Sequence, residues 1–156
     1  GLNSPFVMTE AAKRFVAPLT FRALSGRPVH SDLWTPLAAQ AAEHIALADR
    51  AELVVVAPAT ANILAKLAHG IADDLLSTFL LAIDAPLIVA PAMNVRMWRH
   101  PAVAANCEAL RSRGVRFVGP VEGRLACGTV AQGRMAEPEE ILETLADLAR
   151  DLPGKQ

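Results

Sequence analysis

Short apolar runs alternate with longer helical segments along most of the chain. The two clearest runs, residues 53–57 and 87–90, contain β-branched residues and no charge. Such runs are typical of strands buried on both faces of a parallel sheet. Weaker strand candidates are residues 6–9 and 115–118. Because strand and helix signals alternate, the pattern predicts an α/β fold built on a parallel sheet, in one domain.

Helix start and stop signals frame the segments between these strands. The candidate N-caps are Thr9 for one helix and Asp73 or Asp74 for another. Gly70 and Gly114 suit the position directly after the last turn of a helix. Helices are predicted from residue 10 onward, over 37–48, 61–69 and 75–83, from Pro101 to Gly114, and from Pro138 onward.

Two of these helices carry an apolar stripe that we expect to face inward. The stripes are Leu37, Ala41, Ile45 and Ala48 in one helix, and Ile141, Leu142, Leu145 and Leu148 in the other. Helix 75–83 is almost entirely apolar, so we expect it to be buried, with a subunit interface as one option. Residues 18–36 are predicted to be mostly loop, and residues 119–133 a glycine-rich loop.

The same short pattern follows both clear strands. Ala57-Pro58-Ala59 precedes Asn62, and Ala90-Pro91-Ala92 precedes Asn94. In open α/β sheets, ligands bind beyond the carboxyl ends of the strands. The Asn94 amide, two thioethers and the Trp98 indole at such an end therefore indicate a site. The alternatives are a strand-to-loop corner whose Met and Trp side chains fill the core, and a chance echo in an alanine-rich chain.

The bulk composition narrows the classes of function. The net charge is −1 with no basic stripe, so nucleic acid is not an expected partner. No apolar run approaches the roughly 20 residues that span a bilayer, and we expect no membrane association. The two cysteines do not make a disulfide framework, no secretory signal is visible, and a reducing cytoplasm fits best. No spacing of His, Cys, Asp and Glu suggests a metal site.

Two side chains are candidates for acid–base chemistry. Cys127 lies in a glycine-rich segment near Arg124 and Arg134, where a thiol can act as an acid or nucleophile. The alternative is a small buried hydrophobe in a turn. His44 can serve as a general base, or it can be a packed or surface histidine. Cys107, in mid-helix, favours a structural role, and His30, His69 and His100 are weaker candidates.

The motifs resemble those of a known enzyme family. Residues 91–98 (PAMNVRMW) resemble the PxMNxxMW motif of the flavin-dependent cysteine decarboxylases, and residues 125–128 and 133–138 (LACG, GRMAEP) resemble their substrate-clamp loop. Residues 9–12, 44–48 and 57–62 match in the same order, so the resemblance covers nearly the whole chain. It is strongest with the members that act on phosphopantothenoylcysteine in coenzyme A biosynthesis.

The resemblance implies a Rossmann-like or flavodoxin-like parallel sheet with helices on both faces, and FMN as cofactor. The implied reaction converts 4′-phospho-N-pantothenoylcysteine to 4′-phosphopantetheine. The cysteine thiol is oxidised to a thioaldehyde, carbon dioxide leaves, and the electrons return to the product. In the family pattern His44 is the base, Asn94 holds the substrate carboxylate, and Cys127 supplies a proton.

The resemblance also implies which residues line the two sites. Substrate contacts come from Asn94, Met97, Ala126, Arg134 and Met135. Cofactor contacts come from Thr9, Pro58, Ala59, Thr60, Asn62, Ala92 and Met93. A homo-oligomer is expected, as a homotrimer or a dodecamer of trimers.

Two departures from the family pattern qualify the comparison. Family members begin with a strand and a phosphate-binding loop that we do not find before Phe6, and the bifunctional members continue into a ligase domain after the decarboxylase. We therefore expect a decarboxylase domain trimmed at both ends, without its first strand. The alternatives are a decarboxylase of C-terminal peptide cysteines and a non-catalytic, flavoprotein-like regulatory subunit. A flavin prenyltransferase fits less well, because it needs neither the Met-Asn motif nor Cys127.

Overall fold

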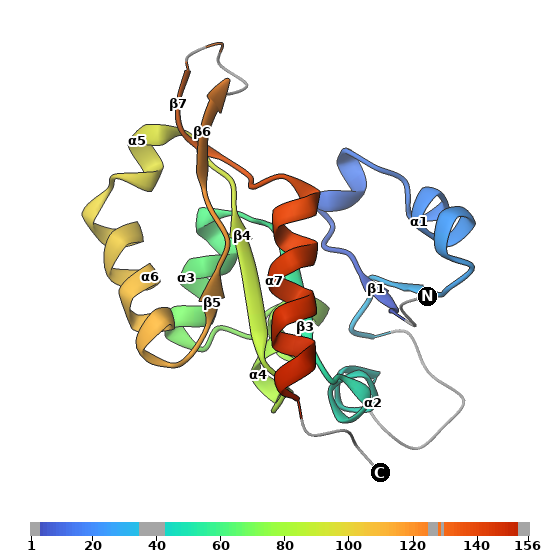
Figure 1. Cartoon of the computed structure of the whole chain (residues 1–156). Helices are drawn as coiled ribbons and strands as arrows, with labels where there is room; N and C mark the ends of the chain where they lie inside the picture. The colour runs from blue at the N-terminus through green and yellow to red at the C-terminus, as the bar shows by residue number, and fades with distance from the viewer. Residues whose placement is uncertain (1–3, 35–42, 125–127, 129, 153–156) are drawn as a thin grey trace. The chain divides into compact units, whose positions relative to one another are not determined.

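The computed structural model describes residues 4–34, 43–124, 128 and 130–152 of the 156-residue chain. The chain forms two compact units, residues 1–50 with 70–83 and residues 51–69 with 84–156, which we describe separately (Figure 1). The prediction of one domain for the whole chain stays a prediction.

The second unit is built on a parallel sheet of three strands in the order β3 (Val54–Ala59), β4 (Leu87–Pro91) and β5 (Arg116–Phe117). Every residue of β4 is buried, as the uncharged apolar run predicts. β3 and β4 run side by side, with Val54 beside Leu87 and Ala59 beside Pro91. The predicted α/β fold with a parallel sheet is confirmed.

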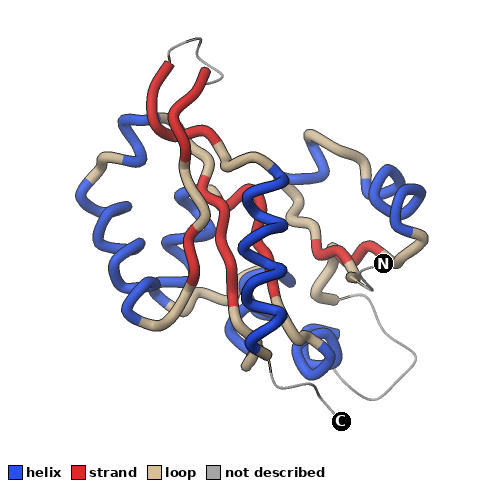
Figure 2. Tube along the Cα trace, viewed as in Figure 1, coloured by secondary structure: helices blue, strands red, loops and turns tan. Residues whose placement is uncertain are grey.

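Helices cover both faces of this sheet (Figures 1 and 2). The helices on the faces are α3 (Ala61–His69), α6 (Pro101–Ser112) and α7 (Pro138–Asp151), and the short α5 (Val95–Trp98) lies beyond the end of β4, beside β7. On one face, Ile141 of α7 packs with Ile88 and Ala90 of β4, and Leu145 and Leu148 contact the same cluster. Leu142 was predicted to face inward and is instead 52% exposed. It directly follows Ile141, and one residue turns the side chain by roughly 100° around a helix.

Residues 119–133 contain a hairpin, which corrects the prediction of a glycine-rich loop. Its antiparallel strands are β6 (Val121–Arg124) and β7 (Val130–Arg134). The prediction failed because glycine normally weakens strands. At Gly123 the missing side chain instead has a packing role, since a Cβ there would lie 2.7 Å from Cδ of Arg134.

The first unit pairs two short parallel strands, β1 (Phe6–Val7) and β2 (Val29–His30). Between them lie a 3₁₀ turn, η1 (Ala12–Arg14), and helix α1 (Pro18–Ser25). The prediction that residues 18–36 are mostly loop was therefore wrong. Pro18 starts the helix at its first turn, and Gly26 ends it in the left-handed conformation at φ 68°.

Two further helices belong to the first unit, α2 (Glu43–Arg50) and α4 (Leu75–Ala82). Residues 37–42 of the predicted helix 37–48 lie outside the described residues. Leu47 and Ala48 are buried in α2, but Ile45 is 41% exposed, so the predicted stripe is wrong at that position. Asp74 caps α4 in a capping box with Ser77, as one of the two predicted N-caps.

Helix α4 is largely buried, as its apolar sequence predicts. Leu75, Phe79 and Leu80 are buried within the structure. Leu81 is half exposed, so most of this helix finds its partners inside the chain. Among the described residues, no helix is long and apolar enough to cross a membrane.

Candidate active site

The two Ala-Pro-Ala corners lie side by side at the carboxyl ends of β3 and β4. The main-chain N–H of Ala92 donates a hydrogen bond to the carbonyl oxygen of Ala59 at 3.0 Å. Ala59 and Pro91 are neighbours in the sheet and both are buried. The repeated sequence pattern thus builds one continuous edge, which is where a parallel α/β sheet binds its ligands.

The hairpin is attached to the same edge. The main-chain N–H of Met93 donates to the carbonyl oxygen of Gly133 at 2.9 Å, and α5 contacts β7 (Figure 1). This bond brings Arg134 and Met135 next to the segment that contains Met93 and Asn94. Two motifs that are separate in the sequence therefore form one constellation in the second unit.

Asn94 occupies the turn between β4 and α5. Its Oδ1 caps α5 by accepting a hydrogen bond from the main-chain N–H of Arg96 at 2.8 Å. The residue is exposed, and its amide nitrogen is the group that suits a carboxylate. Met97 is 48% exposed, so it does not simply fill the core as the alternative interpretation required. Trp98 is partly buried.

The end of β3 presents a second set of exposed residues. Pro58, Thr60 and Asn62 are exposed, and the Ala57–Pro58 peptide bond is cis. The Thr60 hydroxyl accepts a hydrogen bond from the main-chain N–H of Ile63 at 3.4 Å. Thr60 therefore shapes the start of α3, and Pro58 and Asn62 remain accessible.

Arg134 lies across Gly123 on one face of the hairpin. Its guanidinium forms an ion pair with the carboxylate of Glu137, and its side chain is 45% exposed. Sequence reasoning missed Gly123, whose signal is a period-2 alternation: Val121 and Gly123 are partly buried, and the charged Glu122 and Arg124 are exposed. Ala126 and Cys127 lie outside the described residues.

Thr9 and His44 belong to the first unit. The Thr9 hydroxyl accepts a hydrogen bond from the main-chain N–H of Ala12 at 3.1 Å. The helix predicted from residue 10 is only the 3₁₀ turn η1, and its N-cap is Ala11, so the prediction of Thr9 as the N-cap was wrong. His44 is the second residue of α2 as the structure describes this helix, and it is partly buried. Their predicted roles stay predictions.

Cys107 has the structural role expected from its mid-helix position. It is buried in α6, and this burial raises the pKa of its thiol, although the nearby Arg111 guanidinium acts in the opposite direction. Arg111 itself lies over the Phe117 ring, 4.4 Å from the centroid. Within the described residues, no group of three or more His, Cys, Asp and Glu side chains is arranged to hold a metal ion.

Comparison with known proteins decides the family. Residues 1–150 match the family described as Flavoprotein. The chain belongs to the flavoprotein family. This family membership agrees with the resemblance seen in the motifs.

The curated proteins to which the chain is similar include bifunctional proteins. The chain is 52% identical over 143 residues to the coenzyme A biosynthesis bifunctional protein CoaBC of Bacillus subtilis strain 168, with 92% of this chain and 35% of that protein covered. It is 47% identical over 143 residues to CoaBC of Escherichia coli strain K12, again with 92% and 35% covered. The chain thus spans about a third of the length of these relatives.

Solved flavoprotein structures share the fold. One is a PPC decarboxylase mutant complexed with pantothenoylaminoethenethiol, with a TM-score of 0.82 and 33% identity over 94% of this chain and 82% of that chain. Another is the FMN-dependent cysteine decarboxylase SpaF, with a TM-score of 0.80 and 38% identity over 92% of this chain and 78% of that chain.

Proposed function

We propose that this flavoprotein catalyses the FMN-dependent decarboxylation of 4′-phospho-N-pantothenoylcysteine to 4′-phosphopantetheine, a step of coenzyme A biosynthesis. The observation that carries the proposal is the hydrogen bond from Met93 to Gly133, which joins the Asn94 motif to the strand bearing Arg134. The identity to two CoaBC proteins and the likeness to a PPC decarboxylase support the same substrate.

FMN fits the residues at the ends of β3 and β4. Exposed Thr60 and Asn62 offer polar groups, and the small, partly buried Ala92 lets a flat ring approach the main chain. Ala59 is fully buried, so its contact with FMN rests on the family resemblance. We assign cofactor contacts to these residues and to Thr9, Pro58 and Met93. When bound, FMN supplies the redox chemistry, accepting and later returning the electrons of the cysteine thiol.

In this proposal the protein side chains bind the substrate carboxylate and transfer the protons. We assign to the Asn94 amide nitrogen a hydrogen bond to the substrate carboxylate, which orients that group until carbon dioxide leaves. We assign to a His44 ring nitrogen the proton released in the oxidative half, and to the Cys127 thiol the proton that the product carbon gains in the reductive half. Met97, Ala126, Arg134 and Met135 complete the substrate site in this proposal.

We propose a homo-oligomer, as a trimer or a dodecamer of trimers, in the cytoplasm. Its support within the first unit is a group of exposed apolar side chains on and before α1, with Phe15 89%, Leu19 70% and Leu24 82% exposed. Groups of large apolar side chains exposed to solvent are typical of association surfaces. Light scattering of the protein at micromolar concentration measures the state directly, and a strictly monomeric protein contradicts the proposal.

A second candidate is decarboxylation of a C-terminal peptide cysteine, which the similarity to SpaF favours. One experiment separates the two. The FMN-loaded protein is incubated with phosphopantothenoylcysteine or with a peptide ending in cysteine, and the products are identified by mass spectrometry. We expect loss of carbon dioxide from phosphopantothenoylcysteine alone. Turnover of the peptide alone supports the second candidate, and turnover of neither contradicts both.

A further inference from the structure

A side-chain contact joins β2 to the first described turn of α2. His30 Nδ1 and Glu43 Oε1 form a hydrogen bond, which is an ion pair when the imidazole is protonated. The two side chains are only 19% and 10% exposed. Polar contacts shielded from water are stronger than surface pairs, and removing one partner leaves the other poorly solvated.

The histidine end of this contact is itself held in place. β2 pairs with β1, with His30 beside Val7, and the main-chain N–H of Met8 donates to the carbonyl oxygen of His30 at 2.8 Å. Met8 is buried. The first described turn of α2 is therefore bound, through Glu43, to a residue of a hydrogen-bonded strand and not to a residue of a loop.

The glutamate end directly precedes His44 in the same helical turn. Successive residues lie roughly 100° apart around a helix, so holding Glu43 sets the rotation of this turn and with it the direction of the His44 Cα–Cβ bond. Leu47 and Ala48, one turn further along, are buried. Leu47 lies on the same face of the helix as Glu43, because residues four apart share a face. The buried second turn and the contact of Glu43 with His30 therefore hold the helix together on this face.

We propose that His30 and Glu43 are positioning residues that orient the His44 imidazole. The effect on catalysis rests on the proposed function, in which His44 is the base. Orientation of a reacting group matters because a misplacement of roughly 1 Å can cost about 10²-fold in rate. A pair that only stabilised the fold would leave the surroundings of the His44 ring unchanged in a protein that remains folded.

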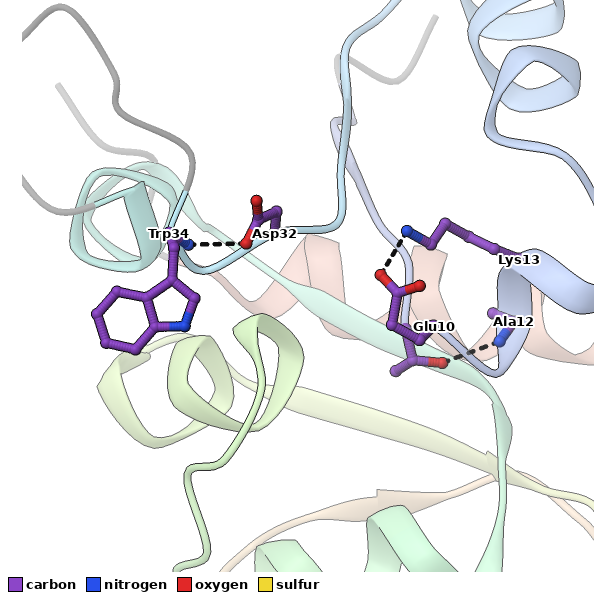
Figure 3. Close-up of polar contacts among 6 residues, drawn as sticks. Glu10, Ala12, Lys13, Asp32 and Trp34 are labelled. Atoms are coloured by element: carbon purple, nitrogen blue, oxygen red, sulfur yellow. Dashed lines mark hydrogen bonds and ion pairs between the residues drawn. The ribbon is translucent and has the colours of Figure 1, made fainter.

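The test compares His30→Ala and Glu43→Gln with wild type in the FMN-loaded protein. Lys13→Ala is the matched control, because it removes the Glu10–Lys13 ion pair of the same unit, drawn in Figure 3. Histidine-labelled protein gives NMR signals of the imidazole rings, and the signal absent from His44→Asn identifies His44. Rapid mixing with phosphopantothenoylcysteine measures flavin reduction.

We expect the His44 ring signal to shift or broaden in His30→Ala and Glu43→Gln but not in Lys13→Ala. Flavin reduction falls about 10- to 100-fold in His30→Ala, with KM changed less than about 2-fold, and falls less in Glu43→Gln because the amide keeps an acceptor oxygen. If His30→Ala does not fold, the His44 ring signal and the rate of flavin reduction in Glu43→Gln decide whether the pair positions His44.

An unshifted His44 signal in folded variants overturns the positioning role. A wild-type protein that shows no flavin reduction with this substrate contradicts the proposed function instead, and the NMR comparison still decides the inference. The two failures are therefore distinguishable.

Discussion

The main-chain N–H of Met93 donates a hydrogen bond to the carbonyl oxygen of Gly133 at 2.9 Å. Both partners are main-chain groups, so the contact does not depend on either side chain. It joins the end of the central strand to the hairpin, and places Arg134 beside the turn that carries Asn94.

Gly123→Ala should weaken substrate binding without affecting the cofactor. The added Cβ would lie 2.7 Å from Cδ of Arg134, so that side chain must leave its place. Loss of one hydrogen bond to a charged group is worth about 1.5 kcal/mol, or roughly a tenfold rise in KM. Steady-state kinetics measures this, and Gln132→Ala, paired with Glu122 on the hairpin, is the control. An unchanged KM would remove Arg134 from the substrate site.

Two substitutions at Asn94 separate its capping role from its proposed substrate role. Asn94→Asp keeps the Oδ1 acceptor for the Arg96 N–H but places a negative charge near the substrate carboxylate. Asn94→Ala loses both, with a cap cost of about 1 kcal/mol. We expect both variants to lose activity, and only Asn94→Ala to melt at lower temperature. An active Asn94→Asp enzyme would contradict the carboxylate contact.

His44→Asn should abolish flavin reduction while folding and FMN binding stay close to wild type. A general base typically contributes about 10²–10⁴-fold to rate. Stopped-flow absorbance after addition of phosphopantothenoylcysteine measures the reduction. If the variant reduces its flavin at the wild-type rate, His44 is not the base.

Cys127→Ser should release carbon dioxide but fail to complete the reductive half. The enzyme would then accumulate a decarboxylated product that is two hydrogens lighter than phosphopantetheine. Mass spectrometry of the product distinguishes the two species. Normal phosphopantetheine formed at the wild-type rate means that another group supplies the proton.

Cys107 should resist thiol reagents in the native protein. Burial removes access and raises the pKa of the thiol, so the reactive thiolate is scarce until the pH rises above the ordinary range of cysteine. In Cys127→Ser, where it is the remaining cysteine, we expect no labelling at neutral pH and complete labelling in denaturant. Fast native labelling would show that α6 opens readily.

The sequence by itself determined the elements whose signals are local. The uncharged runs at residues 53–57 and 87–90 predict buried strands, because a strand covered on both faces has no polar face. The structure has strands there, at Val54–Ala59 and Leu87–Pro91, and every residue of the second is buried. Asp74 and Pro101 mark helix starts through contacts within one turn. The family resemblance also depended on continuous motifs such as residues 91–98. Glycine misled the prediction over residues 18–36 and 119–133, because the same residue ends a helix at Gly26 and packs beneath Arg134 at Gly123.

Only the tertiary structure decided which of these elements meet. The hydrogen bonds from Ala92 to Ala59 and from Met93 to Gly133 join main-chain atoms. Such bonds do not require particular residue types, so the sequence does not show them. The contact of His30 with Glu43 likewise joins two residues that no spacing rule connects. Local patterns record burial and short-range hydrogen bonds, whereas the pairing of distant segments depends on how the whole chain packs its apolar surface. For that reason the candidate residues were readable from the sequence, and the family resemblance implied that Asn94 and Arg134 share a site. The main-chain contacts that bring these two segments of the second unit together were not readable.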